Sequence, residues 1–412
     1  MSEIPPGILY RPRDLYLFVS SRFISTAAMQ VQSVAIGWQI YDMARTPLAL
    51  GLVGLCQFVP MFLFTLPAGD ITDRFNQRVV YRAAALMQAF CSALFLVLTI
   101  VTPHTQWPFY LVLVLFGAAR GFAGPSGQSL LPFLVPPEKL PRSISLSSSF
   151  FTAAIIAGPA LGGFLYVLGP KLVYIFCIIG FATAATIVSQ LGGRRFVPEA
   201  GTLSRLERVA EGIRFVISRP VVMGAISLDL FAVLLGGATA LLPIYARDIL
   251  HVGPMGLGIL RSAPAAGAFM VALLFTRRSI GRHAGAKMFA AVAVFGVATI
   301  VFGLSTWFPL SLAALFMLGA SDMVSVQVRS SLIQLATPDV MRGRVSAVSM
   351  LFIGASNELG EFESGGTAAL LGTVRAVVWG SIGTLAVAGL WMKLFPPLAK
   401  VDRLSDVQTP VS

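Results

Sequence analysis

Charged side chains are scarce in this sequence. Asp, Glu, Lys and Arg supply 12% of the 412 residues, whereas hydrophobic residues supply 56%. An ordinary globular protein carries about 25% charged residues, which it needs to cover its surface. A soluble globular protein is therefore excluded.

Residues that carry chemistry are also few. The three cysteines, Cys56, Cys91 and Cys177, fall inside apolar runs, and the three histidines form no cluster. We expect inert buried thiols instead of disulfides. The sequence contains no G-x-x-x-x-G-K-[ST] phosphate loop and no Ser, His and Asp arrangement typical of a hydrolase. These absences predict no enzyme, no cofactor and no metal site.

Long apolar runs are abundant instead. Windows of about 20 apolar residues, the length that crosses a bilayer as a helix, recur from end to end. Because lipid offers no hydrogen-bond partners, such spans must be helices or a closed barrel, and barrel strands would alternate in period two. The sequence predicts an all-α integral membrane protein with twelve transmembrane helices, at residues 15–43, 47–68, 79–101, 107–135, 144–168, 171–191, 220–245, 254–276, 286–304, 308–335, 345–371 and 374–396.

The basic residues indicate the orientation in the membrane. A net charge of +12 would suit nucleic acid, but Lys and Arg gather in alternate loops, as the positive-inside rule requires. Examples are Lys139, Arg194, Arg277 and Arg342. We expect a multi-pass protein of the cell inner membrane, with both termini cytoplasmic and no nucleic-acid partner.

The two halves of the chain repeat each other. The segments GAARGFAGPSGQSLLPFLVP and GASDMVSVQVRSSLIQLATP align at an offset of 202 residues, which superposes Gly117 on Gly319. Six spans duplicated in one orientation predict two pseudo-symmetric bundles, as in transporters whose halves rock about a central site. The expected domains are a six-helix bundle at 1–191, a cytoplasmic linker at 192–219, a second six-helix bundle at 220–400 and a cytoplasmic tail at 401–412.

The linker contains an amphipathic segment, LSRLERVAEGIRFVI. Its apolar residues Leu206, Val209, Ile213 and Val216 share one face of a helix. This pattern predicts a helix that lies on the membrane surface. A helix that binds a partner protein is the alternative.

The segment GDITDRFNQR, at residues 69–78, concentrates charge between the second and third spans. It resembles the loop signature G-x-x-x-D-R-x-G-R-R of the major facilitator superfamily, with matches at Gly69, Asp73, Arg74 and Arg78. Asn76 replaces the usual glycine, and asparagine also tolerates a left-handed turn. The resemblance implies a conformational latch in which Asp73 and Arg74 stabilise the outward-facing state. A solvated turn with topogenic arginines is the alternative.

Two further motifs carry the same resemblance. RGFAG, with Arg120, resembles the fourth-helix signature R-x-x-Q-G of proton-coupled members, although Ala123 replaces the glutamine. GPALGGFL resembles the fifth-helix motif of the antiporters, which implies a bundle interface associated with export. Its residues are Gly158, Pro159, Gly162 and Gly163. Plain close packing of small residues is the alternative.

The resemblance spans nearly the whole chain. LLPFLVPPEKLPR and NELGEFESG are similar to the branch that contains enterobactin exporters and multidrug efflux proteins. This likeness implies the major facilitator fold, a monomer, and export driven by the proton gradient without a cofactor.

Ionisable residues inside apolar spans cost about 2.5–3.5 kcal/mol on insertion scales and usually mark a pathway or relay. The candidates for proton coupling are Asp229, Glu358, Glu361 and Asp322. The candidates for lining a substrate cavity are Arg22, Gln30, Arg120, Arg329 and Asn357.

Each candidate has an alternative role. Asp229 has no neighbouring cation in the sequence and is the first candidate for proton coupling, or else a hydrogen-bonded structural residue. Arg22 either faces a cavity or snorkels to the interface. Arg120 and Asp322 occupy equivalent positions in the repeat, which would place opposite charges on opposite cavity walls.

Two further sets of candidates also have alternative roles. Glu358 and Glu361 bind protons or cations, or pair with Arg329 of the preceding span. Arg120 instead pairs with polar groups of the first span if it does not face a cavity.

These observations predict a secondary transporter that works by alternating access. Its expected partners are membrane lipid, protons and a small amphipathic substrate of the drug or siderophore class. The alternatives are an uptake carrier, a lipid flippase or a membrane sensor that does not transport.

Overall fold

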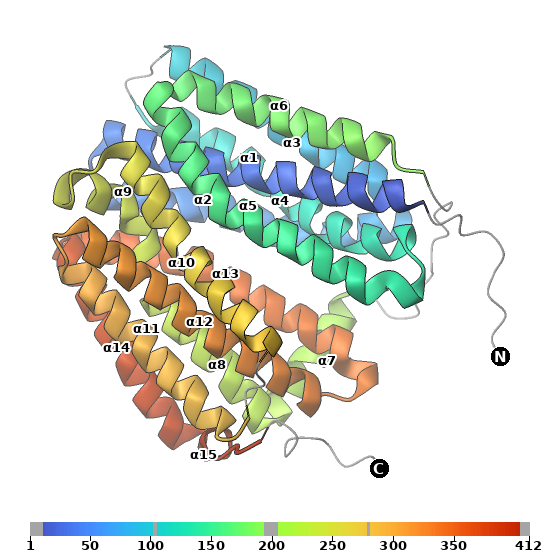
Figure 1. Cartoon of the computed structure of the whole chain (residues 1–412), viewed down its shortest axis with the longest axis vertical. Coiled ribbons are helices and arrows are strands. Elements are labelled where there is room, and N and C mark those ends of the chain that lie inside the picture. The colour runs from blue at the N-terminus through green and yellow to red at the C-terminus, as the bar shows by residue number, and fades with distance from the viewer. Residues whose placement is uncertain (1–10, 102–104, 193–204, 278–280, 404–412) are drawn as a thin grey trace. The chain divides into compact units, whose positions relative to one another are not determined.

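The computed structural model describes residues 11–101, 105–192, 205–277 and 281–403, and all regular elements within them are helical (Figure 1). The helices of the first half are α1 (Pro12–Ala44), α2 (Pro47–Arg74), α3 (Gln77–Val101), α4 (Trp107–Leu134), the 3₁₀ turn η1 (Pro137–Lys139), α5 (Leu140–Leu168) and α6 (Pro170–Ser189). The linker forms α7 (Arg205–Ser218). The helices that follow are α8 (Pro220–Leu235), η2 (Ala238–Leu241), α9 (Leu242–Ile244), η3 (Tyr245–Ile249), α10 (Gly253–Arg277), α11 (Ala284–Leu304), α12 (Phe308–Ala336), α13 (Asp339–Leu371), α14 (Thr373–Leu394) and α15 (Pro396–Ala399).

Proline begins several of these helices. Pro12, Pro47, Pro170 and Pro220 are the first residues of α1, α2, α6 and α8. A proline fits the first turn because its backbone angle is already helical and the missing N–H would have no partner there. The sequence therefore marks these helix starts directly.

Ten helical segments in the described part of the chain are long and apolar enough to cross a membrane. The other two predicted spans correspond to α1 and α13, which are both 33 residues long. Glutamines and charged side chains interrupt their apolar character, among them Gln30 and Gln32 in α1 and Glu358 and Glu361 in α13. Both helices have the length to span a bilayer.

The predicted span 220–245 is a broken helix. α8 ends at Leu235, and η2, α9 and the π-helical turn η3 continue the chain to Ile249. The break lies at two glycines in close contact with neighbours: a Cβ on Gly236 would lie 2.5 Å from Phe295 Cε1, and one on Gly237 would lie 2.6 Å from the carbonyl oxygen of Gly360. The predicted span is supported, since Pro220–Ile249 is long and apolar enough to cross a membrane, but periodicity gives no signal of the break because it does not report such contacts.

Contacts between residues divide the chain into two units. The first comprises Met1–Gln39 and Cys56–Thr202, and the second comprises Ile40–Leu55 and Leu203–Ser412. The end of α1 and the beginning of α2 thus cluster with the second unit. The contact-defined units and the predicted domains 1–191 and 220–400 differ at this hairpin.

In the first unit, α3 packs against both α4 and α6. A stack of aromatic rings fills the centre: the ring of Phe95 lies 5.9 Å from that of Phe109 and 5.7 Å from that of Tyr174. All three side chains are buried. Their burial supplies the apolar packing that joins these helices.

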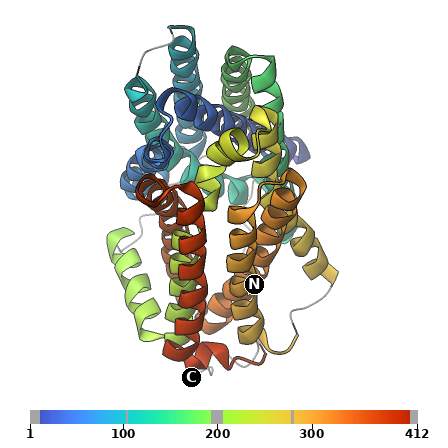
Figure 2. The same cartoon turned by 90° about the vertical axis from the view of Figure 1, so that its left-hand side faces the viewer.

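In the second unit, α12 packs against α10 and α11, and α11 packs against α14. Figure 2 shows the long helices of this unit side by side. One apolar cluster joins α8, α11, α12 and α14 through Leu228, Met288, Val328 and Ala388. This cluster includes residues of α8 and α12, the helices that carry Asp229 and Asp322.

Repeat-related glycines lie at close helix crossings in both units. A Cβ on Gly117 of α4 would lie 2.3 Å from the carbonyl oxygen of Gln57 in α2. A Cβ on Gly319 of α12 would lie 1.8 Å from the carbonyl oxygen of Pro264 in α10. The two halves of the internal repeat therefore both use a small residue to allow close backbone packing between helices.

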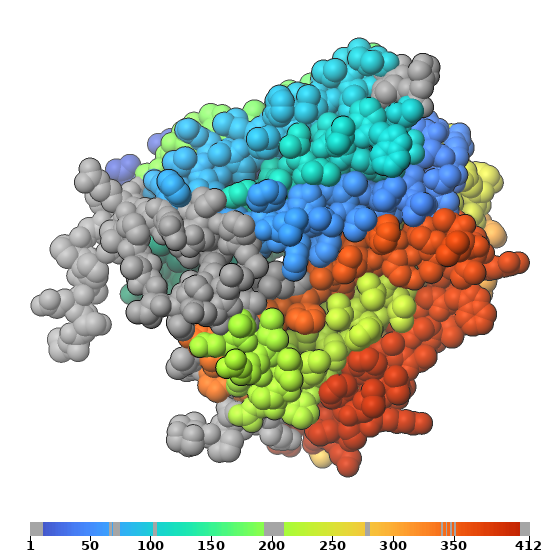
Figure 3. Space-filling model, turned by 180° about the vertical axis from the view of Figure 1, so that it is seen from behind, coloured from blue at the N-terminus to red at the C-terminus, as the bar shows by residue number. Residues whose placement is uncertain are grey.

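The linker helix α7 packs on the second unit beside α13 and α8 (Figure 3). Val216 is buried in a cluster with Val222, Val345 and Val348, and Arg344 forms an ion pair with Glu211. The expectation that the whole apolar face lies on the membrane was therefore wrong for Val216, which packs inside the protein. Ile213 is exposed, and the side chains of Leu206 and Val209 lie outside the described residues.

The end of the described chain caps α11. The Asp402 carboxylate accepts a hydrogen bond of 3.0 Å from the backbone N–H of His283 and one of 3.1 Å from Arg282 Nε. These contacts hold the pKa of the Asp402 carboxyl below its usual value, with the His283 hydrogen bond contributing most. A carboxylate at a helix N-terminus is also favoured by the helix dipole.

We expect Asp402→Asn to lower the thermal unfolding temperature at neutral pH. Because folding lowers the pKa of this group, its contribution to stability is present above the unfolded pKa of about 3.9 and is lost as the pH falls through the folded value. Thermal unfolding of native protein and variant in detergent at a series of pH values tests this. A difference that grows as the pH falls would contradict the assignment.

Candidate functional site

An ion pair lies inside the second unit. Arg329 of α12 contacts the Asp229 carboxylate of α8 through its Nη1 atom. Both side chains are nearly inaccessible, with exposed fractions of 5% and 9%. Removing one partner from such a buried pair costs about 3–5 kcal/mol, because it leaves a charge uncompensated in a medium of low dielectric.

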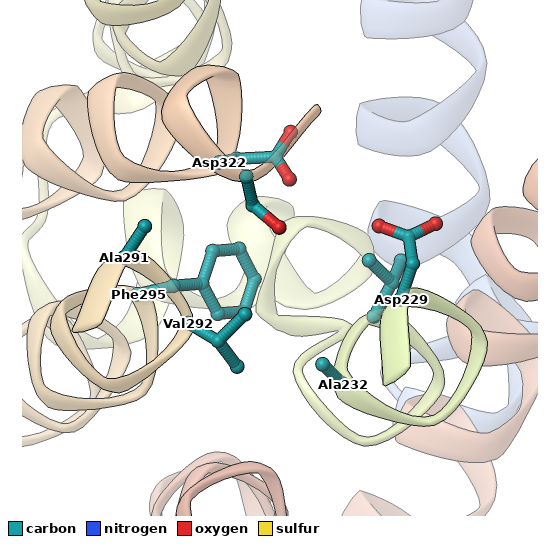
Figure 4. A pocket seen from close by; sticks show the side chains of 8 residues that line it. Asp229, Ala232, Ala291, Val292, Phe295 and Asp322 are labelled. Carbon is teal, nitrogen blue, oxygen red and sulfur yellow. The ribbon is translucent and has the colours of Figure 1, made fainter. Parts of the chain in front are cut away.

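A small cavity opens beside this pair. Its walls come from α8, α11 and α12, and its lining residues are Asp229, Ala232, Val233, Ala291, Val292, Phe295, Asp322 and Ser325. Figure 4 shows the carboxylates of Asp229 and Asp322 on opposite sides of the opening, with the Phe295 ring beside them. The space suits water or a small cation, and it is too small for a drug-sized molecule, which requires about 300–1,000 Å³.

Asp322 differs from Asp229 in its partners. Among the described residues, no hydrogen bond or ion pair involves the Asp322 side chain, whereas Asp229 is paired with Arg329. Asp322, Ser325 and Arg329 lie three and seven positions apart on α12 and therefore share one face of the helix. The cavity thus contains one compensated and one uncompensated carboxylate.

The structure gives Asp229 a partner that the sequence does not reveal. Asp229 has no cation near it in the sequence, yet α12 brings Arg329 to it from 100 positions away. The alternative that Arg329 pairs with the acids of α13 is also not what the structure shows for this residue. Periodicity places both residues inside spans, but only helix packing decides which charges meet.

The acidic residues of α13 occupy a different site. A Cβ on Gly54 of α2 would lie 2.9 Å from Glu361 Oε2, so the beginning of α2 lies against this carboxylate. Arg261 of α10 interacts electrostatically with Glu361. Asn357 is exposed, and Glu358 is partly buried.

Arg261 belongs to the site of Glu361, and the sequence alone did not single it out as a candidate. It is the ninth residue of the 25-residue helix α10 and lies within a segment long and apolar enough to cross a membrane. Its charge within an otherwise apolar helix was the available signal.

In the first unit, Arg22 and Arg120 each contact polar groups of neighbouring helices. Arg22 donates a hydrogen bond of 3.1 Å to Ser147 of α5 and lies 5.5 Å from the centre of the Phe151 ring. Arg120 donates one of 3.1 Å to Gln57 of α2. This hydrogen bond joins Arg120 to the second helix, whereas the alternative from the sequence was a pairing with polar groups of the first.

Gln30 lies at the crossing of α1 with the glycine motif of α5. A Cβ on Gly158 would lie 2.6 Å from Gln30 Cβ, and one on Gly162 would lie 2.9 Å from the Val31 carbonyl oxygen. Pro159 and Gly163 are buried in the same stretch of α5. The motif thus permits backbone contact between α5 and α1 within the first unit.

The predicted latch segment is mostly helical. α2 extends to Arg74 and α3 begins at Gln77, so Gly69, Asp73 and Arg74 belong to the last turns of α2, and their side chains lie outside the described residues. Arg78 donates a hydrogen bond of 2.7 Å to the carbonyl oxygen of Leu191, at the end of α6.

Asn76 caps the start of α3. Its side-chain oxygen accepts a hydrogen bond of 3.0 Å from the backbone N–H of Arg78, which is the N-cap interaction. The residues with positive φ outside glycine do not include Asn76. The expected left-handed turn was therefore wrong, and capping explains an asparagine at this position.

A polar cluster joins the end of α1 to the turn η3 within the second unit. Arg247 forms an ion pair with Asp42, and the Tyr41 hydroxyl donates a hydrogen bond to Asp248. Nearby, a Cβ on Gly365 of α13 would lie 2.6 Å from the Gly51 Cα atom. These contacts explain why residues 40–55 cluster with the second unit.

We expect Arg247→Ala to reduce the free energy of unfolding by about 1 kcal/mol or less. The side chains of Arg247 and Asp42 are 24% and 49% exposed, and solvent screens an ion pair at this level of exposure. Thermal unfolding in detergent measures the loss, with Arg375→Ala as the control. A loss as large as that of a buried pair would contradict this prediction.

Glutamine side chains join α1 to α3, and the sequence alone did not single them out. Ser92 donates a hydrogen bond of 2.5 Å to Gln32, and Gln39 donates one of 3.0 Å to Thr99. The Tyr174 hydroxyl of α6 donates one of 2.5 Å to Gln39. The seven-residue spacing of the two glutamines on α1 was the signal in the sequence.

The chain is similar to known transporters over nearly its whole length. The profile of the transmembrane secretion effector family, MFS_3, matches residues 15–409. The chain is 24% identical to the enterobactin exporter EntS of Citrobacter koseri over 387 residues, which cover 92% of this chain and 91% of that protein. It is 24% identical to that of Shigella dysenteriae serotype 1 over 377 residues, which cover 90% and 89%.

Solved transporter structures share the fold. A bacterial homologue of the human lysosomal transporter Spinster, in an inward-facing and occupied conformation, matches with a TM-score of 0.74 and 14% identity over 99% of this chain and 100% of that one. A bacterial homologue of the iron transporter ferroportin matches with a TM-score of 0.70 and 16% identity over 94% and 99%. The fold class predicted from the sequence is confirmed.

Proposed function

Because the chain belongs to the transmembrane secretion effector family of major facilitator transporters, we propose that it exports a small amphipathic compound in exchange for protons. It is a multi-pass membrane transporter and not an enzyme. The proposed cycle is alternating access, in which proton and substrate favour different conformations.

The observation that carries the proton coupling is the unpaired Asp322 carboxylate. It borders a cavity of about the size of a water molecule, between α8, α11 and α12, and the described residues offer it no cation. A carboxylate withdrawn from water and without a counter-ion holds a proton more tightly than one in solution. This property suits a group that loads and releases one proton in each cycle.

Asp229 is a weaker candidate for the same role. Its ion pair with Arg329 stabilises the charged form, so the proton would have to compete with a buried guanidinium. Glu361 interacts electrostatically with Arg261, and Glu358 also interacts with a neighbouring group. Of the four acidic candidates, Asp322 is therefore the group we propose as the proton acceptor.

Export of a siderophore-like or drug-like compound rests on the relatives. Those described as enterobactin exporters align with about nine-tenths of this chain. The first unit adds a half-buried arginine, Arg22, with aromatic rings around it. A cation beside aromatic rings suits an anionic, aromatic or amphipathic substrate.

The proposal also concerns the conformational change, the membrane and the orientation of the chain. Asp73 and Arg74 form the latch, and Gly158 and Pro159 belong to the interface that moves. The chain resides in the inner membrane as a monomer, with both termini in the cytoplasm. The charge distribution of the loops supports this orientation.

Everted membrane vesicles that contain the protein test this function. A pH-sensitive dye reports whether siderophores, macrolides or lipophilic dyes dissipate an imposed proton gradient, and membranes without the protein serve as the control. We expect dissipation by at least one compound class and its uphill movement into the vesicle lumen. Movement of a compound with no proton flux would favour an equilibrative carrier, and movement of lipid alone would favour a flippase.

A further inference from the structure

We propose that Arg329 keeps Asp229 ionised and thereby sets the proton affinity of the site at Asp322. On this proposal Arg329 does not bind substrate. This inference rests on the proposed function of the same cavity. Arg329 has its guanidinium on Asp229, is 5% exposed, and shares a face of α12 with Asp322. Its guanidinium is therefore already engaged by a carboxylate.

The charges near the cavity lie on the helices that pack around it. α13 and α14 both pack on α8; the second half of α13 carries Glu358, Glu361 and Glu363, α14 carries Arg375 and Lys393, and none of these five lines the cavity. Asp229 and Asp322 are the titratable residues among those that line the cavity. α8 carries no other charged residue, and the single charge on α11, Lys287, lies one turn from its beginning. α10 contributes Arg261, which interacts with Glu361, and Arg277 at its end. On α12 the charged residues are Asp322 and Arg329.

These charges determine what the site binds. With Asp229 ionised and paired to Arg329, the net charge of the site is zero when Asp322 is protonated and minus one when it is not. The site therefore takes up one monovalent cation, and a proton needs the least space. Arg329 keeps Asp229 ionised, so that a single carboxylate titrates instead of two coupled ones.

Substitutions on the two sides of the ion pair should move proton binding in opposite directions. In Arg329→Gln, two carboxylates face one cavity without a cation, so the remaining negative charge on Asp229 strengthens proton binding at the site. In Asp229→Asn, the freed guanidinium stabilises ionised Asp322 and weakens proton binding. We expect the pH of half-maximal proton binding to rise in the first variant and fall in the second, by about one pH unit or more.

The double variant Asp229→Asn/Arg329→Gln separates this role from a structural one. It removes both charges together and leaves groups of similar size, and replacing a buried pair in this way is often tolerated. We expect its pH profile to return to within about half a unit of the native profile. Arg329→Lys, which keeps the charge, should also retain the native profile.

The experiment measures proton binding to purified protein in detergent, from the infrared band of protonated carboxyl groups as a function of pH. Opposite shifts in the single variants and recovery in the double variant support the proposal. Single variants that fold with the native profile, or a double variant whose profile stays shifted, overturn it. If one single variant does not fold, the direction of the shift in the other, measured against the double variant, decides the outcome.

Sodium is the rival occupant of the same cavity. Repeating the titration with sodium replaced by choline distinguishes the two, because a sodium site would show a profile that depends on the sodium concentration. Such dependence would overturn the assignment of a proton as the bound cation. Since this readout needs no transport, a native protein that moves no compound leaves the test of Arg329 intact and counts only against the export function.

Discussion

Replacement of Gly319 by alanine should strongly destabilise the second unit. A Cβ at this position would lie 1.8 Å from the carbonyl oxygen of Pro264, 2.4 Å from its carbonyl carbon and 2.5 Å from its Cα. All three are backbone atoms, so no side chain can rotate away and the two helices must separate. α10 and α12 share one of the most extensive contacts in the second unit. We expect a loss of about 3 kcal/mol or more, at the upper end for overpacking.

The yield of monodisperse protein and its thermal unfolding temperature in detergent measure this effect. Gly389→Ala in α14 is a matched control, because a Cβ there would meet nothing within 4 Å. That variant should be neutral or slightly more stable, since alanine favours a helix over glycine. Gly117→Ala, at the repeat-related crossing, should lose stability as well. Native-like stability of Gly319→Ala would mean that α10 and α12 do not pack as described.

Removal of the Asp322 carboxylate should abolish uphill export. If one proton exchanges for one substrate, a pH gradient of about two units sustains a substrate gradient of about 100-fold, because each unit corresponds to 1.36 kcal/mol. Asp322→Asn cannot load the proton, so this ratio should fall to about one. The amide has nearly the same shape, and we expect the variant to fold.

Two measurements in proteoliposomes separate coupling from transport. The first is accumulation of the substrate against its gradient, and the second is counterflow, the exchange of labelled for unlabelled substrate at equal pH. We expect Asp322→Asn to lose accumulation and to keep counterflow, and Asp322→Glu to retain part of both. Full accumulation by Asp322→Asn would transfer the coupling role to Asp229 or to the acids of α13.

The two predictions test different parts of the second unit. Gly319 lies three residues before Asp322 on α12, so the crossing that Gly319 permits also sets the position of the cavity wall. The glycine contacts α10, whereas the carboxylate faces α8 and α11. Loss of stability in one variant and loss of coupling in the other would therefore be independent results.

The sequence by itself determined the class of protein and the placement of its helices. Apolar runs of bilayer length can only be helices in lipid, and proline at the starts of α1, α2, α6 and α8 marked their beginnings. The offset of 202 residues between Gly117 and Gly319 revealed the repeat. Each glycine is needed because a Cβ there would clash with the backbone of a neighbouring helix. The scarcity of charge made every ionisable residue within a span a candidate.

Only the tertiary structure decided how those candidates combine. Asp229 and Arg329 are 100 positions apart on helices with no shared pattern, so their ion pair follows from the packing of α8 on α12. That pairing leaves Asp322 as the unpaired carboxylate of the cavity. Contacts of Gly236 and Gly237 with α11 and α13 break the helix after Leu235, although the apolar run continues through the break. Composition and periodicity report burial and length, whereas the choice of partner depends on distances between residues that are remote in the chain.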